Sequence, residues 1–452
     1  MLQRTYEALH PGLYRYNTPQ QMREHFALLR RSLDHDQPLD DVYLAFSEFA
    51  ATVRCGHTYA NFFNQSDATR AQLFERADRV PFYFRWLDGR MIVTRNLSPE
   101  VSLSPGTEII AINGISAQTI LARLMLVARA DGSNDAKRIA SLEVLGNEKI
   151  ETFDVFLPLF FPDIGSRQVL TVRAPNETRT RRLTVTVQTY SERFAARPAK
   201  SSSESPWTLD TSNARFAVLR MPTWALYDSA WDWHGFLDQT FNVLNEHAYE
   251  ALVIDLRGNE GGLDVGDVVL AHLVETDLPL SGYLRLVRYR KVPDELLPNL
   301  RTWDPSFKDW GDKAVPWNDR FYRLARYDDD SAGTVIHPAT PHFSGKVFIL
   351  VGATNSSATF EFAQRMKEKH LGILVGQTTG GNQRGINGGA FFFLTLPNSG
   401  IERDVPLIGR FPRDGVTADD AGVAPDVPVP ITAADIAAGT DVELTAVKTL
   451  VK

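Results

Sequence analysis

The sequence predicts an α/β protein whose second half is built on a sheet covered on both faces. Four short, nearly continuous apolar runs occur there: FAVLRMP, ALVIDLR, KVFILVG and GILVG. Helical stretches alternate with them, over Trp231–Asn245 and Phe360–Lys369. Runs of Val, Ile and Leu without polar alternation are typical of strands buried on both faces. Their alternation with helices therefore indicates an α/β core.

The length of the chain and changes in its local composition indicate several domains. At 452 residues it is too long for one ordinary core, so two or three domains are expected. The serine-rich stretch from Ser191 to Pro206 is typical of a linker. We expect a helical region over 1–75, a β-rich domain over 76–192 and the α/β core over 207–452, with an insertion at about 289–342 that is rich in Pro, Trp, Asp and Arg.

Periodicity supports the first two parts. In the N-terminal region Met22, Phe26 and Leu29 recur at three- and four-residue steps, which predicts an amphipathic helix. Thr18-Pro19 is a helix-start signal, a capping residue followed by a first-turn proline. In the second part, Arg182–Val187 alternates polar and apolar residues, as a half-buried strand does.

Composition excludes several function classes. The net charge is -7 and the Lys and Arg residues are scattered, whereas nucleic-acid binders present a basic face, so no nucleic-acid partner is expected. No apolar run approaches the ~18–20 residues of a membrane span, so a soluble chain is expected. Cys55 is the only cysteine, which precludes an intrachain disulfide and predicts an inert buried thiol. No metal-binding helical pair of the HExxH kind is present, and we expect no cofactor.

The N-terminus, MLQRTYEALH, has no apolar segment of the secretory kind. Two interpretations fit this start. The protein is intracellular, or a signal was removed and a Met supplied, which allows a periplasmic or secreted location.

A glycine-rich segment, DLRGNEGG, directly follows the apolar run ALVI. Gly261 and Gly262 at a strand end let the backbone turn tightly and direct N–H groups outward. Two such donors could hold the oxyanion of a tetrahedral intermediate. The alternative is a plain turn in which Asp255 and Arg257 pair and Asn259 caps the next helix.

A serine-containing segment, TNSSATFEFA, lies between the run KVFILVG and a helix. A serine at a helix N-terminus sits in a positive field, which favours its alkoxide and the oxyanion that follows. The alternative is that Ser356 and Ser357 are ordinary helix caps.

A histidine, His57, stands in the segment CGHT at the end of the helical region. Histidine is the usual base for a serine hydroxyl because its pKa lies near neutral pH. The chain has ten histidines, so a surface or core role is the alternative for any one of them.

Together and in this order, CGHT, SPGTEIIAING, DLRGNEGG and NSSATFEFA resemble the tail-specific (C-terminal-processing) serine peptidases, a family that includes the tricorn core protease. The resemblance implies a crotonase/ClpP-like α/β catalytic core and a PDZ-like domain at 76–192. It also implies a serine endopeptidase that cleaves peptides or protein C-terminal tails through an acyl-enzyme. By position, Ser357 matches the nucleophile, with Ser356 as runner-up. The N–H groups of Ala358 and of Gly261 or Gly262 match the oxyanion hole.

One departure concerns the base. The bacterial members of the family share a lysine that serves as general base, and in this resemblance Asn382 occupies the position of that lysine. Asparagine does not accept a proton at neutral pH, so a Ser–Lys dyad is not expected. The tricorn-like branch uses a Ser-His-acid arrangement instead. There His57 matches the base and Asp419 the orienting acid, with Asp420 as its rival, although Gly56 stands where that branch carries a serine.

The PDZ-like segment suggests a substrate with a free C-terminal tail, added as a strand at the domain's edge. The family's carboxylate-binding loop would lie near Phe82 and Phe84, which could equally be core residues. Two other functions fit the same fold. One is a non-catalytic carrier of apolar ligands of the retinoid or lipid type, with the FFF run at 391–393 lining a pocket. The other is a crotonase-like thioester enzyme.

Overall fold

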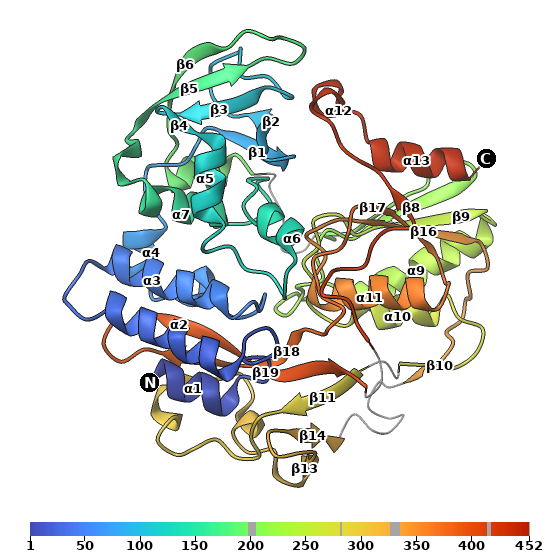
Figure 1. Ribbon diagram of the computed structural model, residues 1–452. Helices are drawn as coiled ribbons and strands as arrows, with labels where there is room; N and C mark the ends of the chain where they lie inside the picture. The colour runs from blue at the N-terminus through green and yellow to red at the C-terminus, as the bar shows by residue number, and fades with distance from the viewer. Residues whose placement is uncertain (198–204, 281–282, 326–334, 414–416, 452) are drawn as a thin grey trace.

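The computed structural model describes residues 1–197, 205–280, 283–325, 335–413 and 417–451. Within these ranges, three six-stranded sheets and one two-stranded sheet organise the chain (Figure 1). The N-terminal helices and the β-rich unit lie on one side and the α/β core on the other, with a further sheet below the helices.

The N-terminal helices follow the predicted periodicity. Thr18 caps the second helix in a reciprocal capping box with Gln21, and Pro19 occupies its first turn. Met22, Phe26 and Leu29 form its buried face, as expected for an amphipathic helix. The helices of this region are α1 (Leu2–Leu9), α2 (Pro19–Ser32), α3 (Leu39–Thr52) and α4 (Asp67–Leu73).

The β-rich unit is an antiparallel sheet in the order β1-β2-β3-β5-β6, with β4 paired to β3. Its strands are β1 (Phe82–Leu87), β2 (Arg90–Asn96), β3 (Glu108–Ile112), β4 (Ile115–Ser116), β5 (Arg167–Arg173) and β6 (Arg181–Thr186). Its helices are α5 (Ala117–Leu124), α6 (Asp135–Ala140) and α7 (Thr152–Phe160).

The expected linker begins as a helix. α8 (Tyr190–Ala195) starts with a capping box between Thr189 and Glu192, a local signal that outweighs the serine-rich composition downstream. Residues 198–204 of the expected linker, and 326–334 of the expected insertion, lie outside the described residues.

The α/β core confirms the predicted fold class. Its sheet has the order β20-β17-β16-β9-β8-β7, parallel except for β7. One face packs against α9 (Trp233–Glu246), α10 (Val265–Ala271) and α11 (Ser357–Glu368), and the other against α13 (Val442–Leu450). α12 (Ala433–Ala438) precedes α13. The strands are β7 (Thr208–Asp210), β8 (Phe216–Arg220), β9 (Ala251–Asp255), β16 (Lys346–Val351), β17 (Ile373–Gly376) and β20 (Val427–Pro428).

The remaining sheet, in the order β12-β18-β19-β11-β14-β13, combines part of the expected insertion with a long hairpin from the C-terminal half. Its strands are β11 (Tyr283–Val287), β12 (Leu300–Arg301), β13 (Ala314–Pro316), β14 (Tyr322–Leu324), β18 (Asn387–Thr395) and β19 (Glu402–Pro412). A short pair, β10 (Leu278–Pro279) and β15 (Val335–Ile336), stands apart.

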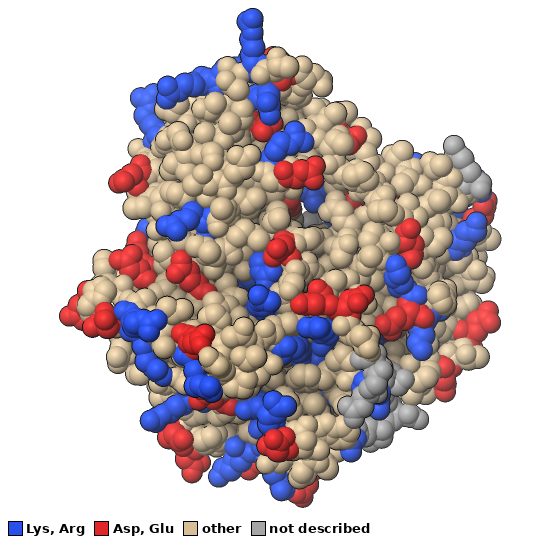
Figure 2. All heavy atoms as spheres, viewed as in Figure 1, with Lys and Arg blue, Asp and Glu red and all other residues tan. Residues whose placement is uncertain are grey.

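Two main hydrophobic clusters result. One joins the N-terminal helices, the β-rich unit and the sheet of β18 and β19, and the other fills the α-helical face of the α/β core. Charges of both signs are interspersed on the face shown in Figure 2. Among the described residues, no helix combines the length and apolar character needed to cross a membrane.

Candidate functional site

The site forms where two neighbouring parallel strands end. Leu350 of β16 pairs with Asp255 of β9, so the loops that follow these strands emerge side by side. Ligand and catalytic sites of α/β sheets form at such carboxyl ends. The first loop carries the glycine-rich segment and the second carries the serines.

Ser357 begins α11 with a left-handed backbone, at φ +51°. A non-glycine residue in this conformation costs on the order of 1–3 kcal/mol and persists only where its surroundings enforce it. Asn355 supplies that constraint, because its side-chain amide donates to the carbonyl oxygens of Leu256 and Asn259, at 2.6 and 2.9 Å. The Thr359 hydroxyl donates to the same Asn259 oxygen at 3.0 Å.

The two serines are used differently. The Ser356 hydroxyl donates to the carbonyl oxygen of Glu260 at 3.2 Å, which ties the serine turn to the glycine-rich loop. Among the hydrogen bonds found within the described residues, none uses the Ser357 hydroxyl. Ser357 is only partly buried, so its hydroxyl remains accessible to a ligand.

The glycines of the loop permit close backbone approach. A Cβ atom at Gly261 would lie 2.9 Å from Ser357 Cβ and 3.0 Å from Ala358 N, and one at Gly262 would lie 2.2 Å from the Trp224 backbone. The Gly261 N–H donates to Asn259 Oδ1 at 2.9 Å. Within the described chain, no such bond is found for the Gly262 N–H, and Ala358, as the second residue of α11, has no intrahelical acceptor for its N–H.

His57 comes from the end of the N-terminal helical region, between Cys55 and Ala60 of the hydrophobic cluster that includes the N-terminal helices. Its Nδ1 atom is buried and has no hydrogen-bond partner among the described residues. Burial and the nearby charge of Arg129 together lower the pKa of His57 to about 4, and Glu260 opposes both. The imidazole is therefore neutral, the form that accepts a proton.

The residue before the histidine has a structural reason to lack a side chain. The Gly56 N–H donates to Asp131 Oδ1 at 3.1 Å, and a Cβ atom at position 56 would lie 2.9 Å from Asp131 Oδ2. A serine there would have to displace this buried carboxylate.

The two candidate orienting acids lie in different surroundings. Asp419 is exposed, and within the described residues none of its contacts reaches His57. Asp420 accepts from the Ser133 N–H at 2.9 Å and from Asn382 Nδ2 at 2.8 Å. Asn382, in the place of the family's lysine, thus anchors a carboxylate. The assignment of Asp419 stays a prediction.

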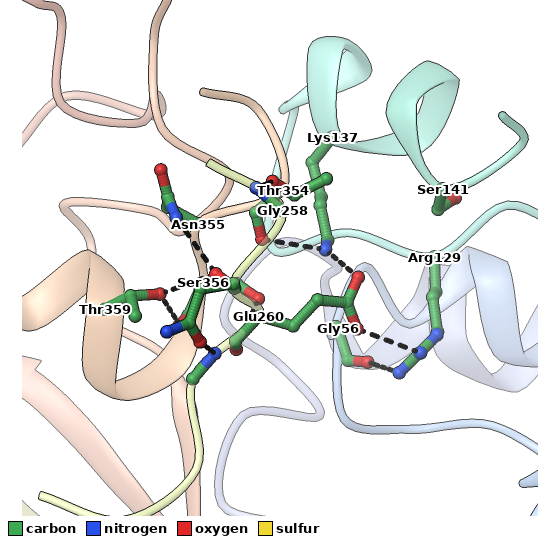
Figure 3. Close-up of polar contacts among 12 residues, drawn as sticks. Gly56, Arg129, Lys137, Ser141, Gly258, Glu260, Thr354, Asn355, Ser356 and Thr359 are labelled. Atoms are coloured by element: carbon green, nitrogen blue, oxygen red, sulfur yellow. Dashed lines mark hydrogen bonds and ion pairs between the residues drawn. The ribbon is translucent and has the colours of Figure 1, made fainter. Parts of the chain in front are cut away.

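A cluster of charged residues that the sequence analysis missed adjoins the serine turn. The Lys137 ammonium of α6 donates to the Glu260 carboxylate and, at 3.1 Å, to the Thr354 carbonyl oxygen. Arg129 lies 3.8 Å from the same carboxylate and donates to the Gly56 carbonyl oxygen at 2.9 Å. Figure 3 shows Lys137 and Arg129 converging on Glu260 from the β-rich unit.

Glu260 is ionised in this cluster. Burial raises the pKa of Glu260, but Lys137 and Arg129 outweigh burial and lower it to about 2. Its negative charge is also the one that raises the pKa of His57. Glu260 is thus the acidic side chain whose charge supports the protonated imidazole in this arrangement.

Three other side chains considered from the sequence belong to the core. Phe82 and Phe84 have no exposed surface, and Phe84 packs edge-on against Phe153 with ring centroids 4.8 Å apart. The prediction that they bind substrate is corrected here, since both rings complete the packing of the β-rich unit. Cys55 is buried, and burial raises the pKa of its thiol to about 11, as expected for an inert cysteine.

The serine and glycine-rich segments of the site lie in a region that is similar to a known peptidase family. Residues 215–429 match Peptidase family S41. The tail-specific protease of Haemophilus influenzae is 26% identical over 193 residues, 41% of this chain and 21% of that protein. The matched region thus spans about a fifth of the curated relative's length.

Solved structures share the fold. Mature CPAF complexed with lactacystin superposes with a TM-score of 0.67 at 16% identity, over 100% of this chain and 96% of that chain. Mature CPAF alone gives 0.65 at 16% identity, over 100% and 95%. At these identities the likeness establishes the architecture. The alternative of an apolar-ligand carrier gains no support from the comparisons.

The left-handed backbone at Ser357 generates a stability prediction. Ser357→Gly should raise the free energy of unfolding by about 1 kcal/mol, because glycine adopts this conformation without strain. The matched control is Ser356→Gly, where φ is -138° and no strain is relieved. Urea denaturation of both variants measures the difference. Equal shifts in the two variants would show that Ser357 is not strained.

Proposed function

We propose that this chain, whose residues 215–429 match Peptidase family S41, is a serine endopeptidase that cleaves peptides or protein C-terminal tails through an acyl-enzyme on Ser357. One observation carries the proposal. A strained serine, whose hydroxyl makes no hydrogen bond within the described residues, stands at the start of α11 against the closely approaching backbone of a glycine-rich loop. Backbone strain of this kind concentrates at functional sites, as in the nucleophile turns of other hydrolases.

In the proposed mechanism, neutral His57 removes the Ser357 proton as the hydroxyl attacks the peptide carbonyl. The N–H groups of Ala358 and Gly262 receive the developing oxyanion, and the Gly261 N–H joins them once released from Asn259. The imidazolium then protonates the leaving amine, and water releases the acyl group. A positioned base contributes about 10²–10⁴-fold, and one oxyanion donor about 10²–10³-fold.

A cavity next to the serine turn supports a peptide substrate. It has a volume of about 730 Å³ and lies between the β-rich unit and the α/β core. Arg85 and Trp86 line one wall, and Gly258 and Thr354 line the other. Figure 2 shows the molecular surface hollowed between these two parts. In this proposal the β-rich unit, as a PDZ-like domain, holds the substrate's C-terminal tail near the catalytic turn.

Labelling with a fluorophosphonate tests the nucleophile. The wild-type chain should be modified on Ser357, and Ser357→Ala should not react. Ser356→Ala is the matched control and should keep its reactivity within about tenfold, because it loses one hydrogen bond to Glu260, worth about 1 kcal/mol. Peptide mapping by mass spectrometry locates the adduct. An adduct on Ser356, or none on the wild-type chain, would contradict the proposal.

The pH dependence tests the base. The reactive form of His57 is neutral, and burial lowers the pKa of His57 to about 4. Accordingly, kcat/KM should rise as the pH increases through about 4 and stay level up to neutral pH. Hydrolysis of a quenched fluorescent peptide across this range measures the profile. A rise with its midpoint above pH 8 would instead indicate a lysine base.

A pair of acid variants tests the charged cluster. Glu260→Gln should lower kcat/KM by tenfold or more, because Lys137 and Arg129 would then act on His57 without an opposing charge. Asp419→Asn is the matched control, since it neutralises an exposed carboxylate without a described contact to His57. Steady-state kinetics of both variants show whether Glu260 or Asp419 has the larger effect on His57. A larger loss in Asp419→Asn would assign the orienting role to Asp419.

A further inference from the structure

Three aromatic side chains, Trp303, Phe391 and Phe393, form a cluster on the surface that we call the aromatic patch. The Trp303 ring lies 5.9 Å from the Phe391 ring and 5.9 Å from the Phe393 ring, centroid to centroid. Trp303 is 58% exposed and both phenylalanines are partly exposed. The mechanism proposed above does not use these rings.

The position of the patch is set by the sheet. Along β18 the side chains alternate, so Phe392 and Leu394 are buried while Phe391 and Phe393 share the outer face. β12 pairs with β18 in the register Arg301 to Phe393, which brings Trp303, two residues further on, over the phenylalanines. Trp303 also packs edge-on against buried Phe307, with centroids 5.5 Å apart. The patch is therefore held in place before any ligand arrives.

The patch is continuous with the proposed base. The Phe391 ring centroid lies 5.8 Å from that of His57. β18 begins beside the same imidazole, since a Cβ atom at Gly388 would lie 3.8 Å from His57 Cε1. The aromatic surface thus starts at the imidazole and extends along β18 toward Trp303.

The role of His57 fixes which part of a substrate would meet this surface. The imidazolium has to reach the leaving amine to protonate it, so the residues after the scissile bond lie on the His57 side. An extended peptide advances about 3.3 Å per residue. A ring 5.8 Å from the imidazole is then within reach of the first two residues after the cleaved bond.

Resting on the proposed function, we propose that the aromatic patch binds an apolar side chain of the substrate at the first or second position after the scissile bond. An exposed apolar cluster next to a reacting group is typical of a ligand-binding surface. Trp303 supplies the outermost contact. It would be a specificity-determining residue contributed by the segment between β12 and β13, which gives the expected insertion a function.

Mapping the cleavage sites of denatured β-casein by mass spectrometry tests this preference. The wild-type chain should cleave mainly where an apolar residue follows within two positions. Trp303→Ala should lose the preference while still cleaving sites that lack such a residue. Trp317→Ala is the matched control, because Trp317 is a 42%-exposed tryptophan beside β13, at the opposite edge of the same sheet.

A peptide pair quantifies the effect. Two quenched peptides that differ only in Leu or Asp at the enriched position should differ about tenfold or more in kcat/KM with the wild-type chain and with Trp317→Ala, and less than about threefold with Trp303→Ala. An unchanged ratio in Trp303→Ala would overturn the proposal and leave the proposed function intact.

If no hydrolysis occurs, peptide binding tests the aromatic patch separately from the proposed peptidase activity. An array of overlapping β-casein peptides, incubated with Ser357→Ala, should retain the chain on peptides rich in Leu, Phe and Val. The double variant, Ser357→Ala with Trp303→Ala, should be retained about tenfold less. Retention that depends on Trp303 without cleavage by the wild-type chain would refute the peptidase and support the patch. Retention indifferent to Trp303 would refute the patch.

Discussion

The left-handed turn at Ser357 is the constraint on which the rest of the site depends. It exists because β9 and β16 are parallel neighbours, so the loops after them are close enough to hold one another. The side chains of Asn355 and Thr359 both use the Asn259 carbonyl oxygen, and Ser356 uses that of Glu260. The strain is thus enforced by hydrogen bonds that the serine turn donates to the neighbouring loop, and the glycines let the two backbones meet.

The site is assembled from two hydrophobic clusters. The serine and glycine loops belong to the α/β core, whereas His57 lies between Cys55 and Ala60, two members of the cluster that includes the N-terminal helices. Lys137 and Arg129 connect these parts, because both pair with Glu260. Lys137 also donates to the Thr354 carbonyl oxygen in the serine turn, and Arg129 donates to the carbonyl oxygen of Gly56, next to His57. Lys137 is buried whereas Glu260 is half-exposed, so loss of Glu260 would leave the buried Lys137 ammonium without its ionic partner.

Patterns confined to a short segment predicted much of this architecture. The apolar runs became the strands of the α/β core, and the serine and glycine segments fell at the ends of β16 and β9. Both are local properties, because a strand's burial and a turn's glycine requirement are visible within a few residues.

What the sequence did not reveal depends on contacts between distant residues. Lys137 and Glu260 are 123 positions apart, and nothing in either segment marks the other as its partner. Phe82 and Phe84 illustrate the same difficulty, since an aromatic strand at a binding loop and one in a core share the same local pattern. The sheet that joins the expected insertion to β18 and β19 likewise needs pairings that only the folded chain defines.

A double-mutant comparison tests whether Ser357 and His57 act as one catalytic unit. Peptide hydrolysis would be measured for Ser357→Ala, His57→Ala and the double variant under one set of conditions. If the imidazole serves only to activate the hydroxyl, the double variant should be no slower than the slower single variant. Losses that multiply in the double variant would show that the two residues act independently, which contradicts activation of Ser357 by His57.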